Sequence, residues 1–255
     1  MEKGRSRKKH KKNPIIIIVV ILLLGAMIFA GVKIASILLD YKKGDDYNES
    51  VVSVAGISTI QIEAGGHNIT LKQIDFDALK SINSDVIGWI ELPDSKIDNP
   101  VVKSKDNIDY LHMDLNGEYS SYGTIFADYR VPTDFSEDLE ILYGHHMKSG
   151  AMFAGLEDFK KQEYYDEHPF FIFYTPDANY LLEPYAGITI GGNEDIYLEC
   201  RTKEDYKAFM DRAIAGSPFK SNIEMDENQK TMALYTCTYT GTDARYIVLC
   251  KMTKL

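Results

Sequence analysis

The sequence predicts a mainly β domain, a barrel or a sandwich, behind a single N-terminal transmembrane helix. Three observations support this fold class. An uncharged apolar run covers residues 15–32, helical patterns are few, and short runs of β-branched and aromatic residues recur between turn-forming residues. Many short strands with few helices are typical of barrels and sandwiches. Eight strands are expected, at residues 89–92, 100–102, 124–127, 140–143, 170–174, 180–190, 231–236 and 246–251.

Charge is divided unevenly along the chain. Residues 1–12 contain seven Lys or Arg and one Glu, so they carry a net charge of +6 while the remainder carries −16. A basic N terminus directly before an apolar run is typical of a membrane-orienting signal. The acidic remainder argues against nucleic acid as a partner.

The apolar run from Ile15 to Val32 is 18 residues long and is closed by Lys33. A transmembrane helix needs about 17 to 25 residues. A cleaved signal peptide has a shorter apolar region, and residues 29–31 form a poor cleavage site. A buried core helix does not explain the basic residues ahead of the run. We therefore expect a cytoplasmic tail at residues 1–14, an uncleaved single-pass anchor in the cell membrane at residues 15–39, and an extracytoplasmic remainder.

Residues 40–73 are polar and weakly patterned, which predicts an extracytoplasmic stalk. Within it, residues 51–62 form either a short strand or irregular chain. One folded domain is expected from residue 74 to residue 255. Its helical patterns begin at Asp75 and recur at residues 151–161 and 203–213, the last with an apolar stripe of Tyr206, Phe209 and Met210.

Residues 231–251 predict a β-hairpin with a cysteine and an arginine at its turn. Cys237 ends the first strand, Arg245 opens the second, and Thr240 to Asp243 supply the turn. The two side chains are therefore expected side by side at one rim of a sheet. A thiol has an unperturbed pKa of about 8.5. A guanidinium stabilises either its thiolate or the oxyanion that forms when the thiolate attacks a carbonyl.

An acid or base for such a site is offered by His145 and His146, which follow the end of an apolar strand pattern. Adjacent strand residues point to opposite sides, so only one of the two rings can face Cys237. A thiol, an imidazole and a guanidinium from three strand ends form a candidate cysteine-nucleophile site. In the alternative interpretation Cys237 is a small buried residue, Arg245 a solvated charge and the histidines a loop pair.

Two further cysteines, Cys200 and Cys250, lack a histidine or arginine context. They either pair with each other or, as we favour, remain inert thiols. The sequence has no CxxC pair, and the diverging rings of His145 and His146 cannot close a metal site. Neither a metal nor a cofactor is expected.

The cysteine and histidine motifs resemble those of a known family, the class B sortases. Leu234-Tyr235-Thr236-Cys237 followed by Arg245 is similar to the TLxTC signature and its arginine, and Tyr143 to Met147 with Met152-Phe153 is similar to the class B histidine segment. Ala233 departs from the threonine of that signature, and we expect this to affect packing rather than chemistry. The likeness covers most of residues 74–255, with further matches at Val86–Ile90, Asn99–Val101, Asn107–Leu111 and Gly123–Phe126.

The resemblance implies a fold and a reaction. The fold is the eight-stranded sortase barrel, in which class B members carry an extra helix between strands six and seven, the place of residues 203–213. Cys237 would attack the carbonyl after the threonine of an Asn-Pro-x-Thr sorting signal near the C terminus of a surface protein. His145 would protonate the departing amine and then deprotonate a peptidoglycan amine, while Arg245 would bind the oxyanion. A wall substrate implies a Gram-positive cell.

The resemblance also implies substrate contacts by six residues, Asn107, Leu111, Tyr143, Tyr197, Leu198 and Tyr235. Tyr235 replaces a smaller residue that is common in the family, which leaves the exact motif preference open. Without the resemblance, such aromatics are interpreted as core or rim packing. Two other functions stay open: a secreted cysteine peptidase or amidase that hydrolyses rather than transfers, and a membrane-tethered binding module without catalysis.

Overall fold

The computed structural model describes residues 14–56, 58–237 and 243–255, and the chain divides into two units at residues 43 and 44. The first unit, as far as it is described, is the N-terminal part of helix α1 (Pro14–Val54). Among the described residues, α1 is the one helix long and apolar enough to cross a membrane, and residues 18–39 are exposed along it. Residues 1–13 of the predicted basic tail lie outside the described residues.

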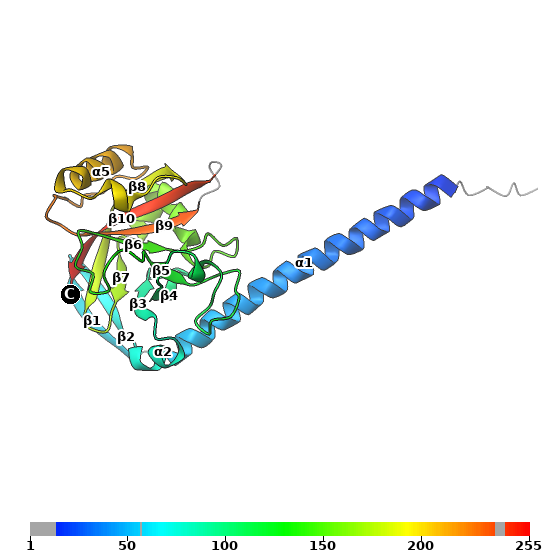
Figure 1. Ribbon diagram of the computed structural model, residues 1–255, viewed down its shortest axis with the longest axis horizontal. Helices are drawn as coiled ribbons and strands as arrows, with labels where there is room; N and C mark the ends of the chain where they lie inside the picture. Colours follow the sequence, from blue (N-terminus) through cyan, green and yellow to red (C-terminus); the bar gives the residue numbers. More distant parts are fainter. Residues whose placement is uncertain (1–13, 57, 238–242) are drawn as a thin grey trace, which may run out of the picture. The chain divides into compact units, whose positions relative to one another are not determined.

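Eight strands form a closed barrel in the second unit (Figure 1). The strand pairs β4–β5 and β6–β9 are parallel, and the other six are antiparallel. All eight predicted strands are present, so the barrel prediction is confirmed. Around the barrel the order is β10 (Ala244–Lys254), β8 (Asn179–Gly191), β7 (Phe171–Tyr174), β3 (Val86–Glu91), β4 (Asp98–Lys103), β5 (Ile125–Ala127), β6 (Leu139–Tyr143) and β9 (Thr231–Cys237).

Strand β9 closes the barrel between β6 and β10. Its parallel register with β6 pairs Tyr143 with Tyr235, and the backbone N–H of Gly144 donates to the Tyr235 carbonyl at 3.1 Å. Its antiparallel register with β10 pairs Cys237 with Arg245, as the hairpin prediction requires. The predicted turn lies outside the described residues, apart from Asp243. The ends of β6 and β9 therefore meet the start of β10.

Two helices between β8 and β9 cover the outer face of the closing strands, α4 (Ile196–Glu199) and α5 (Lys203–Gly216). Helix α5 begins at the cap residue Thr202, whose hydroxyl accepts from the backbone N–H of Asp205. Its predicted apolar stripe is buried against β8, β9 and β10. In chain order the predicted helix thus follows the sixth barrel strand, β8, and precedes the seventh, β9; α5 is labelled in Figure 1.

The helix predicted at residues 151–161 is instead a 3₁₀ helix, η2 (Phe153–Lys160), followed by the short helix α3 (Gln162–Glu167). Phe153, Leu156 and Phe159 are fully buried. Their spacing of three residues fits the three residues per turn of a 3₁₀ helix, which places all three on one edge. The predicted apolar pattern is present, but its period is that of a 3₁₀ helix and not that of an α-helix.

Residues 44–73, within the predicted stalk, belong to the folded unit. The end of α1 and the hairpin of β1 (Ser58–Ala64) and β2 (His67–Gln73) bury apolar side chains in one cluster with the short helix α2 (Phe76–Ile82) and Trp89 of the barrel. Of the region left open between strand and irregular chain, residues 51–54 are helical and residues 58–62 are strand. The members of that cluster from these segments are Val51, Ala55, Ile69, Leu71 and Leu79.

A buried glutamate on β6 gives a testable property of the fold. Glu140 has no exposed surface, and its Oε1 accepts from the backbone N–H of Glu137 at 3.0 Å. Its Oε2 has no hydrogen-bond partner among the described residues. Burial raises the pKa of Glu140 from 4.5 to about 8. The folded protein therefore retains a proton that the unfolded chain loses between these two pH values.

We predict that Glu140→Gln becomes more stable relative to the unmodified protein as pH rises from about 5 to about 8. In that window the folded state binds more protons than the unfolded state, so unfolding free energy falls by up to about 1.4 kcal/mol per pH unit. The neutral glutamine removes this dependence. Urea unfolding at several pH values measures it, with Glu163→Gln, an exposed carboxylate on α3, as the control. Parallel pH profiles of Glu140→Gln and the unmodified protein would contradict the prediction.

Candidate active site

A cavity of about 390 Å³ opens where the ends of β6, β9 and β10 meet. His145, two residues beyond β6, lines it together with Arg245 and Thr236. In the parallel register of β6 and β9, two residues beyond the Tyr143–Tyr235 pair the chain reaches His145 and Cys237. His145 and Arg245 thus line one cavity, and the backbone of Cys237 lies at the strand end next to both.

Contacts with Asp243 and Ala244, at the start of β10, hold the Arg245 side chain at the cavity rim. Its Nη1 lies 2.8 Å from Oδ1 of Asp243 and donates to the Ala244 carbonyl at 3.2 Å. About a quarter of the side chain, 27%, is exposed. The guanidinium is therefore a fixed positive charge beside the backbone position of Cys237, its partner across the strand pair. Such a charge favours a thiolate or an oxyanion.

His145 is oriented by a backbone carbonyl on η1 (Asp109–Leu111). Its Nε2 lies 2.6 Å from the carbonyl oxygen of Leu111. A carbonyl only accepts, so Nε2 carries a proton and the neutral ring has Nδ1 as its proton acceptor. The exposed ring of His112 stacks on His145 at 5.5 Å between centroids. Burial lowers the pKa of His145, the Leu111 carbonyl opposes this, and the neighbouring His112 lowers the pKa further.

His146 lies on the other side of the chain, as strand alternation predicts. Its Nε2 is 2.9 Å from a carboxylate oxygen of Glu157 on η2. It is not among the residues that line the cavity with His145 and Arg245. Of the two adjacent histidines, only His145 therefore has access to the place where the strand ends meet.

Four of the six predicted substrate-contact residues, Asn107, Leu111, Tyr143 and Tyr235, line the cavity. The other two, Tyr197 and Leu198, lie on α4 and are not part of its lining. The ring of Tyr197 packs under the guanidinium of Arg130 at 4.4 Å, and Leu198 is 55% exposed. Tyr197 thus contacts Arg130, a residue that does line the cavity.

Two lining residues that the sequence did not predict are Arg130 and Asp195. A signal was present, because Asp128 and Arg130 directly follow a buried strand, where polar residues collect at the rim of a barrel. No local pattern connects them to Asp195, which lies 65 residues further along the chain.

The remaining cysteines are not suited to nucleophilic chemistry. Both Cys200 and Cys250 are free thiols. Burial raises the pKa of Cys200 to about 12 and that of the fully buried Cys250 well above its ordinary value. A thiol with a raised pKa holds little thiolate at neutral pH. The preference for two inert thiols over a disulfide is therefore supported.

We predict that His112→Gln raises the pKa of His145. The substitution removes the neighbouring histidine and uncovers one face of the His145 ring, and both changes favour the charged imidazolium. NMR titration of the histidine ring protons in the full chain measures this. His168→Gln, which removes a ring packed on Tyr164, is the control. An unchanged or lower pKa of His145 in His112→Gln would show that His112 does not tune the ring.

Comparison with known proteins gives a consistent result. No family model matches the chain. Sortase B of Staphylococcus aureus is 32% identical over 183 residues, which cover 71% of this chain and 75% of that protein. Sortase B of Listeria monocytogenes is 30% identical over 217 residues, which cover 84% of this chain and 86% of that protein.

Solved structures agree with these relatives. A Staphylococcus aureus sortase B–substrate complex superposes with a TM-score of 0.66 at 32% identity, covering 71% of this chain and 85% of that chain. Sortase B of Bacillus anthracis superposes with a TM-score of 0.73 at 28% identity, covering 86% of this chain and all of that chain (100%). The closed eight-stranded barrel, its helices and the sequence identity together show that this chain belongs to the sortase B family and is a cysteine transpeptidase.

Proposed function

We propose that this transpeptidase cleaves an Asn-Pro-x-Thr type sorting signal near the C terminus of surface proteins and joins the acyl part to a peptidoglycan amine. The observation that carries the proposal is the meeting of three strand ends, which pairs Cys237 with Arg245 and brings His145 to the same cavity. The catalytic roles follow from that arrangement, with Cys237 as nucleophile, His145 as acid and base, and Arg245 as oxyanion partner.

In the first half-reaction, the Cys237 thiolate attacks the carbonyl carbon of the signal's threonine. The negative charge that develops on the oxygen is met by the Arg245 guanidinium. The C–N bond then breaks, protonated His145 gives its proton to the departing amine, and a thioester remains on Cys237. The lowered pKa of His145 makes its protonated ring a stronger acid for this step.

In the second half-reaction, an amine attacks the thioester carbon and neutral His145 takes the proton of the attacking nitrogen. A new amide bond forms, and Cys237 leaves as the thiolate. The thioester keeps the acyl group reactive until the amine arrives. Two related structures support a peptide substrate and an amine acceptor, since one is a sortase B–substrate complex and another is sortase B complexed with triglycine.

The proposed location rests on α1. Its residues 15–39, which contain the apolar run from Ile15 to Val32, are long enough to cross a bilayer, and the basic residues ahead of them favour a cytoplasmic N terminus. The catalytic domain then lies outside the cytoplasm, where sorting signals and wall precursors of a Gram-positive cell are exposed. Because residues 44–73 pack into the folded unit, we place the start of the extracytoplasmic domain near residue 44.

We predict that the full chain in detergent cleaves a quenched Asn-Pro-x-Thr peptide faster than a Leu-Pro-x-Thr peptide, and that an added amine diverts the product from the acid to the amide. Cys237→Ala and His145→Ala are expected to lower kcat by at least about a thousandfold, as removal of a nucleophile or its proton donor does. Arg245→Ala is expected to lower it by roughly a hundredfold to a thousandfold, as loss of an oxyanion donor does.

Two substitutions of the same residue types outside the proposed site serve as controls. Cys200→Ala removes a thiol of raised pKa, and His146→Ala removes the neighbouring ring that faces away from the cavity. Both are expected to retain activity. Full activity of Cys237→Ala would contradict the proposal, and hydrolysis that no amine diverts would favour a peptidase instead. Activity in His145→Ala with loss in His146→Ala would reverse the assignment of the two histidines.

A further inference from the structure

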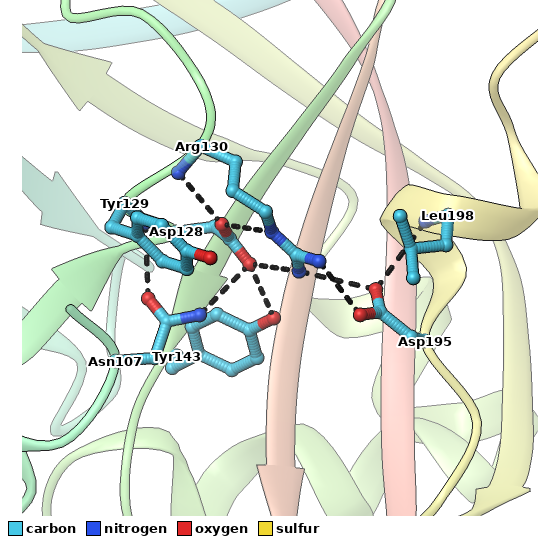
Figure 2. A network of polar contacts seen from close by, with 7 residues as sticks. All are labelled: Asn107, Asp128, Tyr129, Arg130, Tyr143, Asp195 and Leu198. Carbon is cyan, nitrogen blue, oxygen red and sulfur yellow. Dashed lines mark hydrogen bonds and ion pairs between the residues drawn. The ribbon is translucent and has the colours of Figure 1, made fainter.

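In one wall of the cavity, a single arginine binds two carboxylates and so connects two segments of the chain (Figure 2). Arg130 reaches Asp128 through Nε at 2.8 Å and Nη2 at 2.6 Å. It reaches Asp195 through Nη1 at 2.6 Å and Nη2 at 3.1 Å. Each carboxylate is therefore bound by two nitrogens of one planar guanidinium, a geometry that fixes both position and orientation.

Asp128 forms the buried side of this arrangement. Its side chain has no exposed surface, and besides Arg130 it accepts from Nδ2 of Asn107 at 3.0 Å and from the hydroxyl of Tyr143 at 2.9 Å. Burial alone raises the pKa of Asp128, but the hydrogen bonds from Arg130, Tyr143 and Asn107 outweigh it and hold the pKa below its usual value. An ionised Asp128 is thus shared by two residues of the predicted substrate wall.

Asn107 is oriented from both ends of its amide. Its Nδ2 donates to Asp128, and its Oδ1 accepts from the backbone N–H of Tyr129 at 3.0 Å. An amide has two N–H groups and two lone pairs on oxygen, so beside these two bonds within the described residues one donor and one acceptor position remain for a ligand in the cavity. The hydrogen bond to Asp128 fixes the orientation of the Asn107 amide. The two hydrogen bonds from Arg130 in turn fix the position of the Asp128 carboxylate.

Asp195 forms the outer side. It is 39% exposed and caps α4, since its Oδ1 also accepts from the backbone N–H of Leu198 at 3.3 Å. The guanidinium that binds it also stacks on Tyr197 of the same helix. Arg130 therefore links the segment after β5 to the start of α4 through an ion pair and a ring contact, although strand pairing connects neither segment to the other.

We propose that Arg130, with Asp128 and Asp195, is a positioning clamp that fixes the substrate-binding wall of the cavity. The proposal rests on the proposed function in that the wall binds the sorting-signal peptide. The Arg130 clamp (Asp128, Arg130 and Asp195) makes no hydrogen bond or ion pair to His145 or Arg245 within the described part of the chain. It therefore acts on peptide binding and leaves the reactivity of the Cys237 thiol unchanged.

The clamp is tested in the full chain in detergent with two variants. Asp195→Ser keeps an oxygen that can cap α4 but removes the carboxylate that binds Arg130, so it separates the clamp from the cap. Arg130→Lys keeps the charge beside the buried Asp128 but cannot bind two carboxylates with paired nitrogens. Asp211→Ser is the matched control, because it removes an exposed carboxylate of α5 that is ion-paired with Lys207 outside the cavity.

Three experiments are made: steady-state kinetics for KM and kcat with the Asn-Pro-x-Thr peptide, the rate of alkylation of Cys237, and hydrogen exchange of the backbone over residues 193–200. Both clamp variants are expected to raise KM by roughly tenfold to a hundredfold, the range for a displaced binding group. Alkylation is expected to stay unchanged and exchange over residues 193–200 to become faster. In the Arg130→Lys background, Asp195→Ser is expected to add little, because the shared contact is already weakened.

The outcomes separate this proposal from the proposed function. If the unmodified chain does not cleave the peptide, the proposed sorting signal is wrong, and hydrogen exchange alone decides on the clamp. Faster exchange over residues 193–200 in both variants, but not in Asp211→Ser, supports it. Unchanged exchange, full additivity of the two substitutions, or a loss confined to kcat with slower alkylation of Cys237 overturns it.

Discussion

The register of β9 is the constraint on which the rest of the structure depends. This strand pairs with β6 on one side and with β10 on the other, and so closes the barrel. The first pairing brings the chain after Tyr143 level with Cys237, and the second sets Cys237 opposite Arg245. A slip of one residue would send every side chain of β9 to the opposite face. The buried residues on both faces of β9 prevent such a slip, and the proposed chemistry depends on that barrel closure.

Two different physical devices build the cavity. Backbone ladders place the groups proposed for chemistry, whose mutual distances must hold to within a fraction of an ångström. Side-chain hydrogen bonds and ion pairs place three further lining residues that come from segments no ladder joins: Asn107, Arg130 and Asp195. Recognition can therefore vary among relatives through a few side chains while the barrel and its strand ends stay the same.

The sequence predicted features that depend on residues close together in the chain, and it did not predict features that depend on contacts between distant segments. Alternation and turn residues predicted the hairpin of Cys237 and Arg245. Alternation alone indicated that only one of the two adjacent histidines can face Cys237. The resemblance then favoured His145, in agreement with its position at the cavity. The polar pattern of residues 40–73 predicts a stalk, because the burial of Val51 and Leu71 depends on distant surfaces around Trp89 that no local pattern shows. The sequence did not predict Arg130 and Asp195 as cavity residues for the same reason, since an ion pair across 65 residues leaves no local pattern.

The most direct test of the central claim is the identity of the covalent intermediate. The full chain is mixed with an Asn-Pro-x-Thr peptide without an amine, quenched in acid, and analysed by intact mass and peptide mapping. We predict that the acyl fragment ending in threonine is attached through a thioester to Cys237, and that an added amine releases it as the amide. Cleavage without any adduct, or an adduct on Cys200 or Cys250, would contradict the assignment of Cys237 as the nucleophile.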